Sequence, residues 1–182
     1  MAKVYVFLAD GFEEVEAITQ VDLLRRAGIN VVTVSVTGQN QVHGSHGIDI
    51  IADILFEGNL LDADMLVLPG GMPGTSTLME HSGLRDLIIK YNDSKKYLAA
   101  ICAAPSVFGV NRLLVGKKVT CYPGYEQNLL DAIIVNQPVV EDDNFITSKA
   151  AGTSIDFGLA LVRKLCSKEV ADQIKESLHY ER

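Results

Sequence analysis

The chain has 182 residues, a net charge of −7, 48% hydrophobic residues and 21% charged residues. This length suits a single domain spanning residues 1–182, and the composition excludes a disordered chain, a collagen-like repeat and a coiled coil. Because an acidic surface repels phosphate groups and basic residues occur only in isolated pairs, we expect no binding to nucleic acid. No apolar stretch approaches the roughly 18 residues of a membrane span, and the apolar start is too short for a secretion signal. We therefore expect a cytoplasmic protein without membrane contact.

Segments typical of strands and of helices alternate along the chain. In chain order we expect a strand at 3–9, a helix at 13–27 ended by Gly28, a strand at 31–36, a hairpin or irregular edge at 38–53, a strand at 65–68, a helix at 83–91 and a strand at 97–101. A helix at 103–114, a short strand at 118–121, weaker strands at 133–135 and 145–148, and a last helical region at 153–178 with a break near Ser167 follow.

This alternation predicts the fold class. Apolar runs such as residues 3–9 suit strands that are buried on both faces, as in a parallel sheet. Short connections between strands and helices predict an α/β fold with an open, mostly parallel, doubly wound sheet covered by helices. Active sites in such sheets lie beyond the carboxyl ends of the strands, where the strand order reverses. That rule points to residues 10–11, 69–71, Cys102 and 121–122, each of which follows a predicted strand.

Cys102 lies at a predicted turn between a buried strand and a helix, with Ala100 and Ala104 two positions on either side. Small residues at those two positions are typical of a nucleophile elbow, where the backbone is crowded. We expect the N-terminus of the following helix to lower the pKa of this thiol. A buried, inert cysteine in an alanine-rich core is an equally good interpretation of the local pattern alone.

The glycines in Pro69-Gly70-Gly71 could aim backbone N–H groups at a ligand. The N–H of Gly71 could join that of Ala103 in binding a developing oxyanion. A phosphate cradle is the rival functional interpretation, but the segment lacks the lysine and the serine or threonine of a P-loop. An ordinary turn at the exit of a strand would also explain the glycines.

Glu13, Glu14 and Glu16 open the helix predicted at 13–27, where acidic side chains commonly complement the helix dipole. Glu16 shares a helix face with Leu23 and Ala27, so it need not be fully solvated. A carboxyl group held beside a thiolate in an apolar pocket would keep its proton. It could then donate a hydrogen bond to sulfur or pass a proton during turnover.

The remaining candidate side chains give weaker signals. His43 and His46 lie three residues apart without a third ligand, which is more typical of a surface than of a metal site, so we expect no metal. Tyr122 follows a predicted strand and would more commonly be an exposed or packing residue. The three cysteines cannot all pair in disulfides. Cys121 is a candidate resolving thiol, and we expect Cys166 to be in the core.

Four motifs occur in the order and spacing of the ThiJ/PfpI superfamily: residues 11–17 (GFEEVEA), 66–71 (LVLPGG), 99–105 (AAICAAP) and 152–154 (GTS). The chain resembles this family over nearly its whole length, and within it most resembles the branch of the parkinsonism-associated protein deglycase. The resemblance implies a flavodoxin-like three-layer sandwich that is usually a homodimer. Activities attributed to the family are cofactor-independent glyoxalase, protein deglycase, oxidation-dependent chaperone and, in more distant branches, peptidase.

The resemblance also implies roles for single residues. By position, Cys102 matches the nucleophilic cysteine of the family and Glu16 matches the glutamate that hydrogen-bonds it. Gly71 and Ala103 match the backbone donors beside that cysteine, and Gly70 directly precedes Gly71.

Three positions depart from the family pattern or vary within it. Tyr122 stands where the family often has a histidine beside the cysteine. His46 replaces an arginine near the pocket and the dimer interface, whereas Arg26 matches a second arginine. The Gly-Pro-Gly-Thr loop of the family is here residues 150–153 (AAGT), preceded by Lys149. With Gly70, the side chains of Tyr122, Arg26 and His46 are the candidate binding residues.

These observations lead to three functional hypotheses. The first is an enzyme without cofactors that acts on small reactive carbonyls such as 2-oxoaldehydes, or on their glycated adducts, through Cys102. The second is a redox-responsive sensor or chaperone, in which the same thiol is oxidised. The third is an amidotransferase-like or peptidase-like hydrolase, which the absence of a histidine beside the elbow disfavours.

Overall fold

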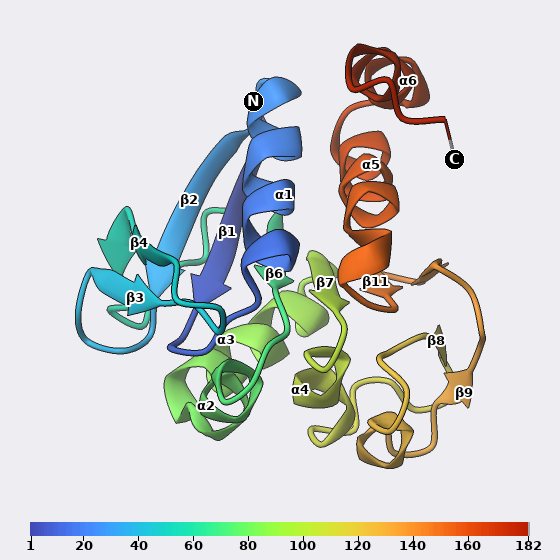
Figure 1. Cartoon of the computed structure of the whole chain (residues 1–182). Coiled ribbons are helices and arrows are strands. Elements are labelled where there is room, and N and C mark those ends of the chain that lie inside the picture. The colour runs from blue at the N-terminus through green and yellow to red at the C-terminus, as the bar shows by residue number, and fades with distance from the viewer. Residues whose placement is uncertain (182) are drawn as a thin grey trace.

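The computed structural model describes residues 1–181 and has a seven-stranded sheet at its centre (Figure 1). The strand order is β10-β11-β7-β6-β1-β2-β5, and all neighbours are parallel except β10 and β11. The strands are β1 (Lys3–Leu8), β2 (Asn30–Ser35), β5 (Ile54–Leu55), β6 (Met65–Leu68), β7 (Tyr97–Ile101), β10 (Val139–Asp142) and β11 (Phe145–Ser148). The flavodoxin-like α/β fold expected from the sequence is confirmed.

Helices cover both faces of this sheet. One layer contains α1 (Glu14–Arg26), α5 (Ser154–Leu165) and α6 (Lys168–Ser177), and the other contains α2 (Gly74–Glu80), α3 (Ser82–Asp93) and α4 (Pro105–Gly109). Alternate residues of β1 pack against the two helix layers, because successive side chains of a strand point to opposite faces. Val4 and Val6 pack in the core with α1 and α5, whereas Tyr5 and Phe7 pack in the core with α3 and α4. Figure 1 shows α1 and α5 side by side on the first face.

Two small sheets lie outside the central one. The hairpin expected at 38–53 is formed by β3 (Gln41–His43) and β4 (Asp49–Ile51), which pair antiparallel. The second small sheet pairs β8 (Lys118–Val119) with β9 (Ile133–Ile134) in parallel. Single 3₁₀ turns occupy Glu126–Asn128 and Ala151–Thr153. Within residues 1–181, no helix combines the length and the apolar character needed to cross a membrane.

The structure corrects several expectations about local elements. The helix expected at 103–114 is only the five-residue α4, because the chain turns after Gly109 and Arg112 adopts a left-handed φ of 56°. The strand expected at 118–121 pairs with β9 outside the central sheet. The elements α2, β5 and β10 were not predicted. Cys166, expected in the core, is exposed at the end of α5.

The expected break near Ser167 is confirmed. The Ser167 side chain accepts a hydrogen bond from the backbone N–H of Val170 (3.3 Å) and so caps the start of α6.

The strand order reverses between β1 and β6. The chain leaves β1 toward β2 on one side and later returns to place β6 on the other side of β1. The loops that follow these two strands therefore diverge at the carboxyl edge of the sheet, which leaves room for a site between them. Residues 9–13 and 69–73 form these loops, and the turn after β7 at Cys102 lies beside them.

Candidate active site

Cys102 occupies a sharp turn directly after β7. Its φ is 64°, a left-handed value that is strained for a residue with a side chain. Two backbone hydrogen bonds fix this turn: the Cys102 N–H donates to the carbonyl of Ser148 (3.0 Å), and the Cys102 carbonyl accepts from the N–H of Tyr122 (2.8 Å). The thiol is partly exposed. The sequence predicted an elbow in which a helix directly follows the nucleophile, whereas in the structure a turn separates Cys102 from α4, which begins at Pro105.

Glu16 lies in the first turn of α1 and is fully buried. Glu13 holds that turn in place, because its carboxylate accepts a hydrogen bond from the backbone N–H of Glu16 (2.6 Å). The Oε2 atom of Glu16 accepts a hydrogen bond from the N–H of Gly70 (2.8 Å). The carboxyl group also interacts with the Cys102 thiol and with the N–H of Ala151, while Oε1 has no hydrogen bond of regular geometry.

The two glycines after β6 allow these groups to approach. A Cβ atom at Gly70 would lie 2.7 Å from the Cβ of Cys102 and 2.7 Å from Oε2 of Glu16, which is closer than such atoms pack. Gly71 has a φ of 91°, and a Cβ there would lie 2.4 Å from both the Glu13 nitrogen and the Gly11 carbonyl oxygen. Glycine is therefore required at both positions for steric reasons.

Backbone donors surround the sulfur atom. The N–H groups of Ala103 and Gly71 both interact with the Cys102 thiol. They come from the turn after β7 and from the loop after β6, which the parallel pairing of the two strands holds side by side. Donors fixed in this way can stabilise negative charge on sulfur, or on an oxygen attached to a carbon bound to it.

Burial raises the pKa of Glu16 to about 7, although hydrogen bonds from Cys102 and Gly70 oppose the shift. Burial also raises the pKa of the Cys102 thiol, and the charge of the neighbouring Glu16 carboxylate adds to this effect. The thiol pKa therefore moves opposite to the lowering that we expected from a helix N-terminus. The physical reason is that α4 is short and begins only at Pro105, so its dipole opposes the desolvation weakly.

The protonation states of Cys102 and Glu16 are linked, because the two side chains interact directly. The Glu16 carboxylate raises the pKa of the thiol only while it is ionised, so this repulsion disappears when the carboxyl takes up a proton. The form of the site that carries a thiolate is consequently the one in which Glu16 holds the proton and can donate a hydrogen bond to sulfur. Protonation of Glu16 therefore removes one of the two effects that oppose a thiolate, whereas the burial of the sulfur remains.

Tyr122 lies at the exposed side of the site. The backbone N–H of Tyr122 donates a hydrogen bond to the carbonyl of Cys102. Its side chain is exposed, and its ring packs edge-on against the ring of Tyr125 with centroids 6.3 Å apart. The neighbouring Cys121 is buried, and burial together with the charge of Glu126 raises its pKa to about 11. A thiol with this pKa is a poor resolving nucleophile at neutral pH.

His46 lies in the hairpin loop and is joined to the start of α1. Its backbone N–H donates to Oε1 of Glu14 (2.6 Å), and its ring Nδ1 lies 2.7 Å from Oε2. Burial alone would raise the pKa of Glu14, but hydrogen bonds from the ring and backbone of His46 and from Ser45 lower it to about 2. The Glu14 carboxylate thus holds the hairpin against the helix that carries Glu16.

Glu13, Glu14 and His46 are also the residues whose placement could suit a metal ion, since one ligand atom from each lies within 4.8 Å of the others. The oxygens of Glu14 already accept the hydrogen bonds from His46 and Ser45. These bonds account for the cluster without an ion.

Arg26 is not brought to this site. It lies at the far end of α1, ten residues after Glu16, which is about 15 Å along a helix axis. Its guanidinium pairs with Asp22 one turn earlier (2.7 Å).

The carboxylate of Glu14 and the N–H of Ala151 were not predicted to belong to the site. Glu14 lies in a run of acidic residues, and no local pattern distinguishes the member that bonds a distant loop. Gly44 was one available signal, because a Cβ there would lie 2.2 Å from Oε1 of Glu14.

Comparisons with known proteins agree with this fold. A family model described as "DJ-1/PfpI family" matches residues 2–164. The chain belongs to the DJ-1/PfpI family. It is 38% identical over 180 residues to "Protein DJ-1 homolog B" of Arabidopsis thaliana, covering 97% of this chain and 41% of that protein. It is 35% identical to "Protein dj-1beta" of Drosophila melanogaster, covering 95% of this chain and 94% of that protein.

A solved structure titled "Toxoplasma gondii DJ-1, oxidized" superimposes with a TM-score of 0.96 at 33% identity, and the match covers 100% of both chains. The chain spans less than half the length of the Arabidopsis relatives that it matches, but nearly the whole of the Drosophila protein. The fold is therefore shared with the Toxoplasma protein over the full length of both chains.

The raised pKa of Glu16 has a consequence for stability. Unfolded chains release this proton near pH 4.5, whereas the folded protein keeps it to about pH 7. The folded state therefore loses stability as pH rises between these values. We expect the free energy of unfolding of Glu16→Gln, relative to wild type, to rise by about 3 kcal/mol between about pH 4 and pH 8 in denaturant titrations.

Glu14→Gln is the matched control in the same helical turn. Its pKa is lowered, so the carboxylate stabilises the fold above about pH 4.5, and this contribution is lost as pH falls toward 2. The stability difference of Glu14→Gln should thus change with pH in the opposite direction. Parallel pH profiles for the two variants would contradict this assignment.

Proposed function

We propose that this DJ-1-type protein is a stress-protective, cysteine-dependent enzyme that acts on reactive 2-oxoaldehydes or their adducts without a cofactor. The observation that carries the proposal is the pairing of a partly exposed Cys102 with a fully buried Glu16 whose pKa is raised to about 7. A general acid and base works best when its pKa lies near the working pH.

The first step is addition. The Cys102 thiolate attacks the aldehyde carbon of a 2-oxoaldehyde, and a carbon–sulfur bond forms while the carbonyl π electrons move to oxygen. The N–H groups of Gly71 and Ala103 support this step, because they already surround the sulfur. Protonation of the oxygen by Glu16 gives a hemithioacetal and leaves Glu16 as a carboxylate.

The second step moves a proton between carbons. The Glu16 carboxylate takes the proton from the former aldehyde carbon, and an enediolate forms. Glu16 returns this proton to the neighbouring carbon, the hydroxyl proton moves from the first oxygen to the second, and the product is a 2-hydroxy thioester on Cys102. Water then cleaves the carbon–sulfur bond and releases a 2-hydroxy acid and the free thiol. One carbon is oxidised and its neighbour is reduced, so no external oxidant or reductant is needed.

The same site can serve an adduct of a 2-oxoaldehyde with an amine or thiol. Gly70 keeps the approach to Cys102 narrow, and the exposed ring of Tyr122 lies at the rim. His46, bonded to Glu14, belongs to the neighbouring hairpin. We assign Gly70, Tyr122 and His46 to substrate binding. Arg26 is not assigned to it, because it lies at the opposite end of α1.

Oxidation of Cys102 is the second candidate function. A protonated Glu16 and the N–H groups of Gly71 and Ala103 could also hold the oxygens of a sulfinate. The Toxoplasma relative is described as oxidized, which supports this candidate by analogy. A peptidase-like function is less favoured, because Tyr122 stands beside the elbow where a histidine base would be needed.

We also propose a homodimer that uses the start of α1 and the β3–β4 hairpin. Val15 and Ile18 on α1, and Ile48 and Ile51 on the hairpin, are large apolar side chains that are exposed. The Glu14–His46 contacts join these two elements into one surface. Exposed apolar patches of this kind mark protein interfaces, and a twofold axis would let the patch cover itself.

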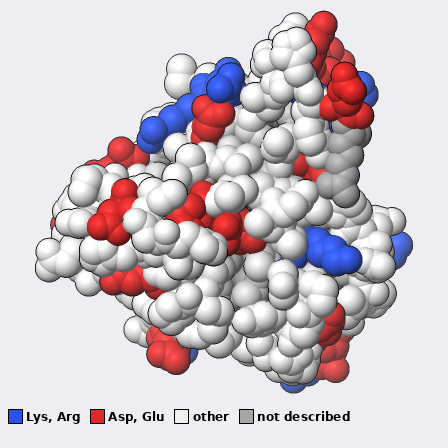
Figure 2. Space-filling model, in the orientation of Figure 1, with Lys and Arg blue, Asp and Glu red and all other residues white. Residues whose placement is uncertain are grey.

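A cytoplasmic location is part of the proposal, since a reducing compartment would keep Cys102 as a free thiol. Figure 2 shows acidic and basic side chains scattered over one face, with the basic ones in separate small groups. This distribution supports a small-molecule substrate rather than a nucleic acid.

The enzymatic proposal predicts that the protein converts methylglyoxal to lactate without glutathione or added metal. Cys102→Ser should lower kcat/KM by about a thousandfold or more, because the nucleophile is lost. Cys166→Ser removes an exposed cysteine elsewhere and should keep the wild-type rate. Lactate can be measured enzymatically. Wild-type turnover no higher than that of Cys102→Ser would overturn the proposal.

The redox candidate predicts selective oxidation. After mild peroxide treatment, intact mass and peptide mapping should show a gain of two oxygens, about 32 Da, at Cys102 before Cys121 or Cys166 react. Glu16→Gln should slow formation of the sulfinate or destabilise it, since the acid donor is altered. Equal or earlier oxidation of the exposed Cys166 would count against this function.

The dimer proposal predicts a mass of twice 19.8 kDa in light scattering. Ile51→Glu should give the monomer, because it places a charge in the apolar patch where Ile51 is 70% exposed. Ile134→Glu is the control, as Ile134 is an exposed isoleucine in the short strand β9. A monomeric wild type, or an equal effect of both substitutions, would rule out this interface.

A further inference from the structure

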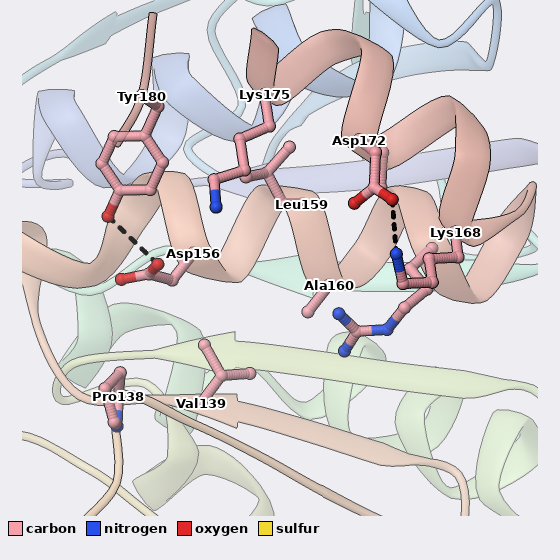
Figure 3. A pocket seen from close by; sticks show the side chains of 11 residues that line it. Pro138, Val139, Asp156, Leu159, Ala160, Lys168, Asp172, Lys175 and Tyr180 are labelled. Carbon is pink, nitrogen blue, oxygen red and sulfur yellow. Dashed lines mark hydrogen bonds and ion pairs between the residues drawn. The ribbon is translucent and has the colours of Figure 1, made fainter. Parts of the chain in front are cut away.

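A groove of about 480 Å³ lies away from Cys102, between α5, α6 and β10 (Figure 3). This volume is within the range of small-molecule sites in proteins. Val139 enters from β10, Leu159 and Ala160 come from α5, and Ala171 comes from α6. Leu159, Ala160 and Ala171 are nearly buried, so their surfaces form an apolar floor between the two helices.

Charged side chains border this floor, and most of them are already paired. Lys168 pairs with Asp172 (2.5 Å), and the hydroxyl of Tyr180 donates to Asp156 (3.0 Å). Arg163 lies in the groove lining and pairs with Glu141 on β10.

Lys175 differs from these residues. Among residues 1–181 it has no side-chain hydrogen bond or ion pair, although it is half-buried in the groove lining. Figure 3 shows its side chain extending from α6 toward α5, in the part of the groove between Tyr180 and Leu159. An amphipathic cation in this position covers apolar surface with its stem and offers an unused charge at its tip.

The charges of the lining select the ligand. Asp156 and Asp172 lie in the same groove as Lys175, so a dianion such as a phosphate monoester would meet repulsion as well as attraction. Among the described residues of the lining, Lys175 offers one unpaired ammonium, which suits a single carboxylate, and the floor of Leu159, Ala160 and Val139 suits a small apolar body.

We propose that this groove binds small monocarboxylates with an aromatic or aliphatic body, with the carboxylate at Lys175 and the apolar body between α5 and β10. The site is separate from Cys102 and does not depend on the function proposed for that residue. Tyr180 would form one wall, held by its bond to Asp156.

The groove is connected to the elbow through the backbone. The carbonyl of Pro138, in the lining, accepts hydrogen bonds from the Ser148 hydroxyl (2.9 Å) and from the Lys149 N–H (3.1 Å). The backbone carbonyl of Ser148 in turn accepts a hydrogen bond from the N–H of Cys102. A ligand in the groove would therefore contact the segment that fixes the turn at Cys102.

The test uses 4-fluorobenzoate as the probe and the full-length protein. We expect saturable binding in ¹⁹F NMR with a Kd of about 1 mM or tighter, and Lys175→Met should weaken it about fivefold or more. The neutral analogue 4-fluorobenzyl alcohol should lose a similar factor with the wild-type protein. Lys90→Met is the matched control, because Lys90 is an exposed lysine in the last turn of α3, in the opposite helix layer.

Backbone amide shifts place the probe. In ¹⁵N spectra the largest changes should fall on residues such as Val139, Ala160 and Ala171, and the rest of each spectrum shows that the variants are folded. Absence of saturable binding would overturn the proposal. Equal affinity of wild type and Lys175→Met would do so as well, and so would shifts confined to residues around Cys102.

Discussion

The close approach of the backbone at Gly70 to Cys102 and Glu16 is the constraint on which the site depends. A Cβ atom at that position would lie 2.7 Å from atoms of both side chains, so no other residue leaves them in place. The contact brings together three segments: the loop after β6, the turn after β7 and the first turn of α1. Parallel pairing of β6 with β7 and with β1 sets the spacing of these segments, so the sheet, rather than a ligand, positions the groups.

This arrangement explains why one site can support either turnover or oxidation. The carboxyl group is costly as an anion, because Glu16 is fully buried and its Oε1 atom lacks a regular hydrogen bond. Proton uptake relieves that cost and removes the repulsion that disfavours a thiolate at Cys102. The same donors could then support a hemithioacetal oxygen or the oxygens of a sulfinate. The difference between the two functions would lie in what reaches the exposed side of the thiol.

Much of the fold and part of the candidate site could be predicted from the sequence, because the patterns that indicate them are local. The apolar runs of β1, β6 and β7 and the alanines around Cys102 indicate buried strands and a crowded turn, and the face that Glu16 shares with Leu23 indicates its burial. Features that depend on distant partners were not predictable. The length of α4 is set where Gly109 packs against residues 128–129, and β5 and β10 are short strands defined by pairing with their neighbours. The direction of the pKa shift at Cys102 could not be predicted either, because it depends on the shortness of α4 and on the charge of the adjacent Glu16.

Two carboxyl groups in one helical turn behave oppositely. Glu14, with a pKa of about 2, remains an anion wherever the protein is folded near neutral pH, and it ties the hairpin loop to α1 through His46 and Ser45. Glu16, two residues later, changes its charge near pH 7. The start of α1 thus separates a permanent anchor from a variable proton donor. Changes in cellular acidity around neutrality would alter the chemistry at Cys102 while the frame around it keeps its shape.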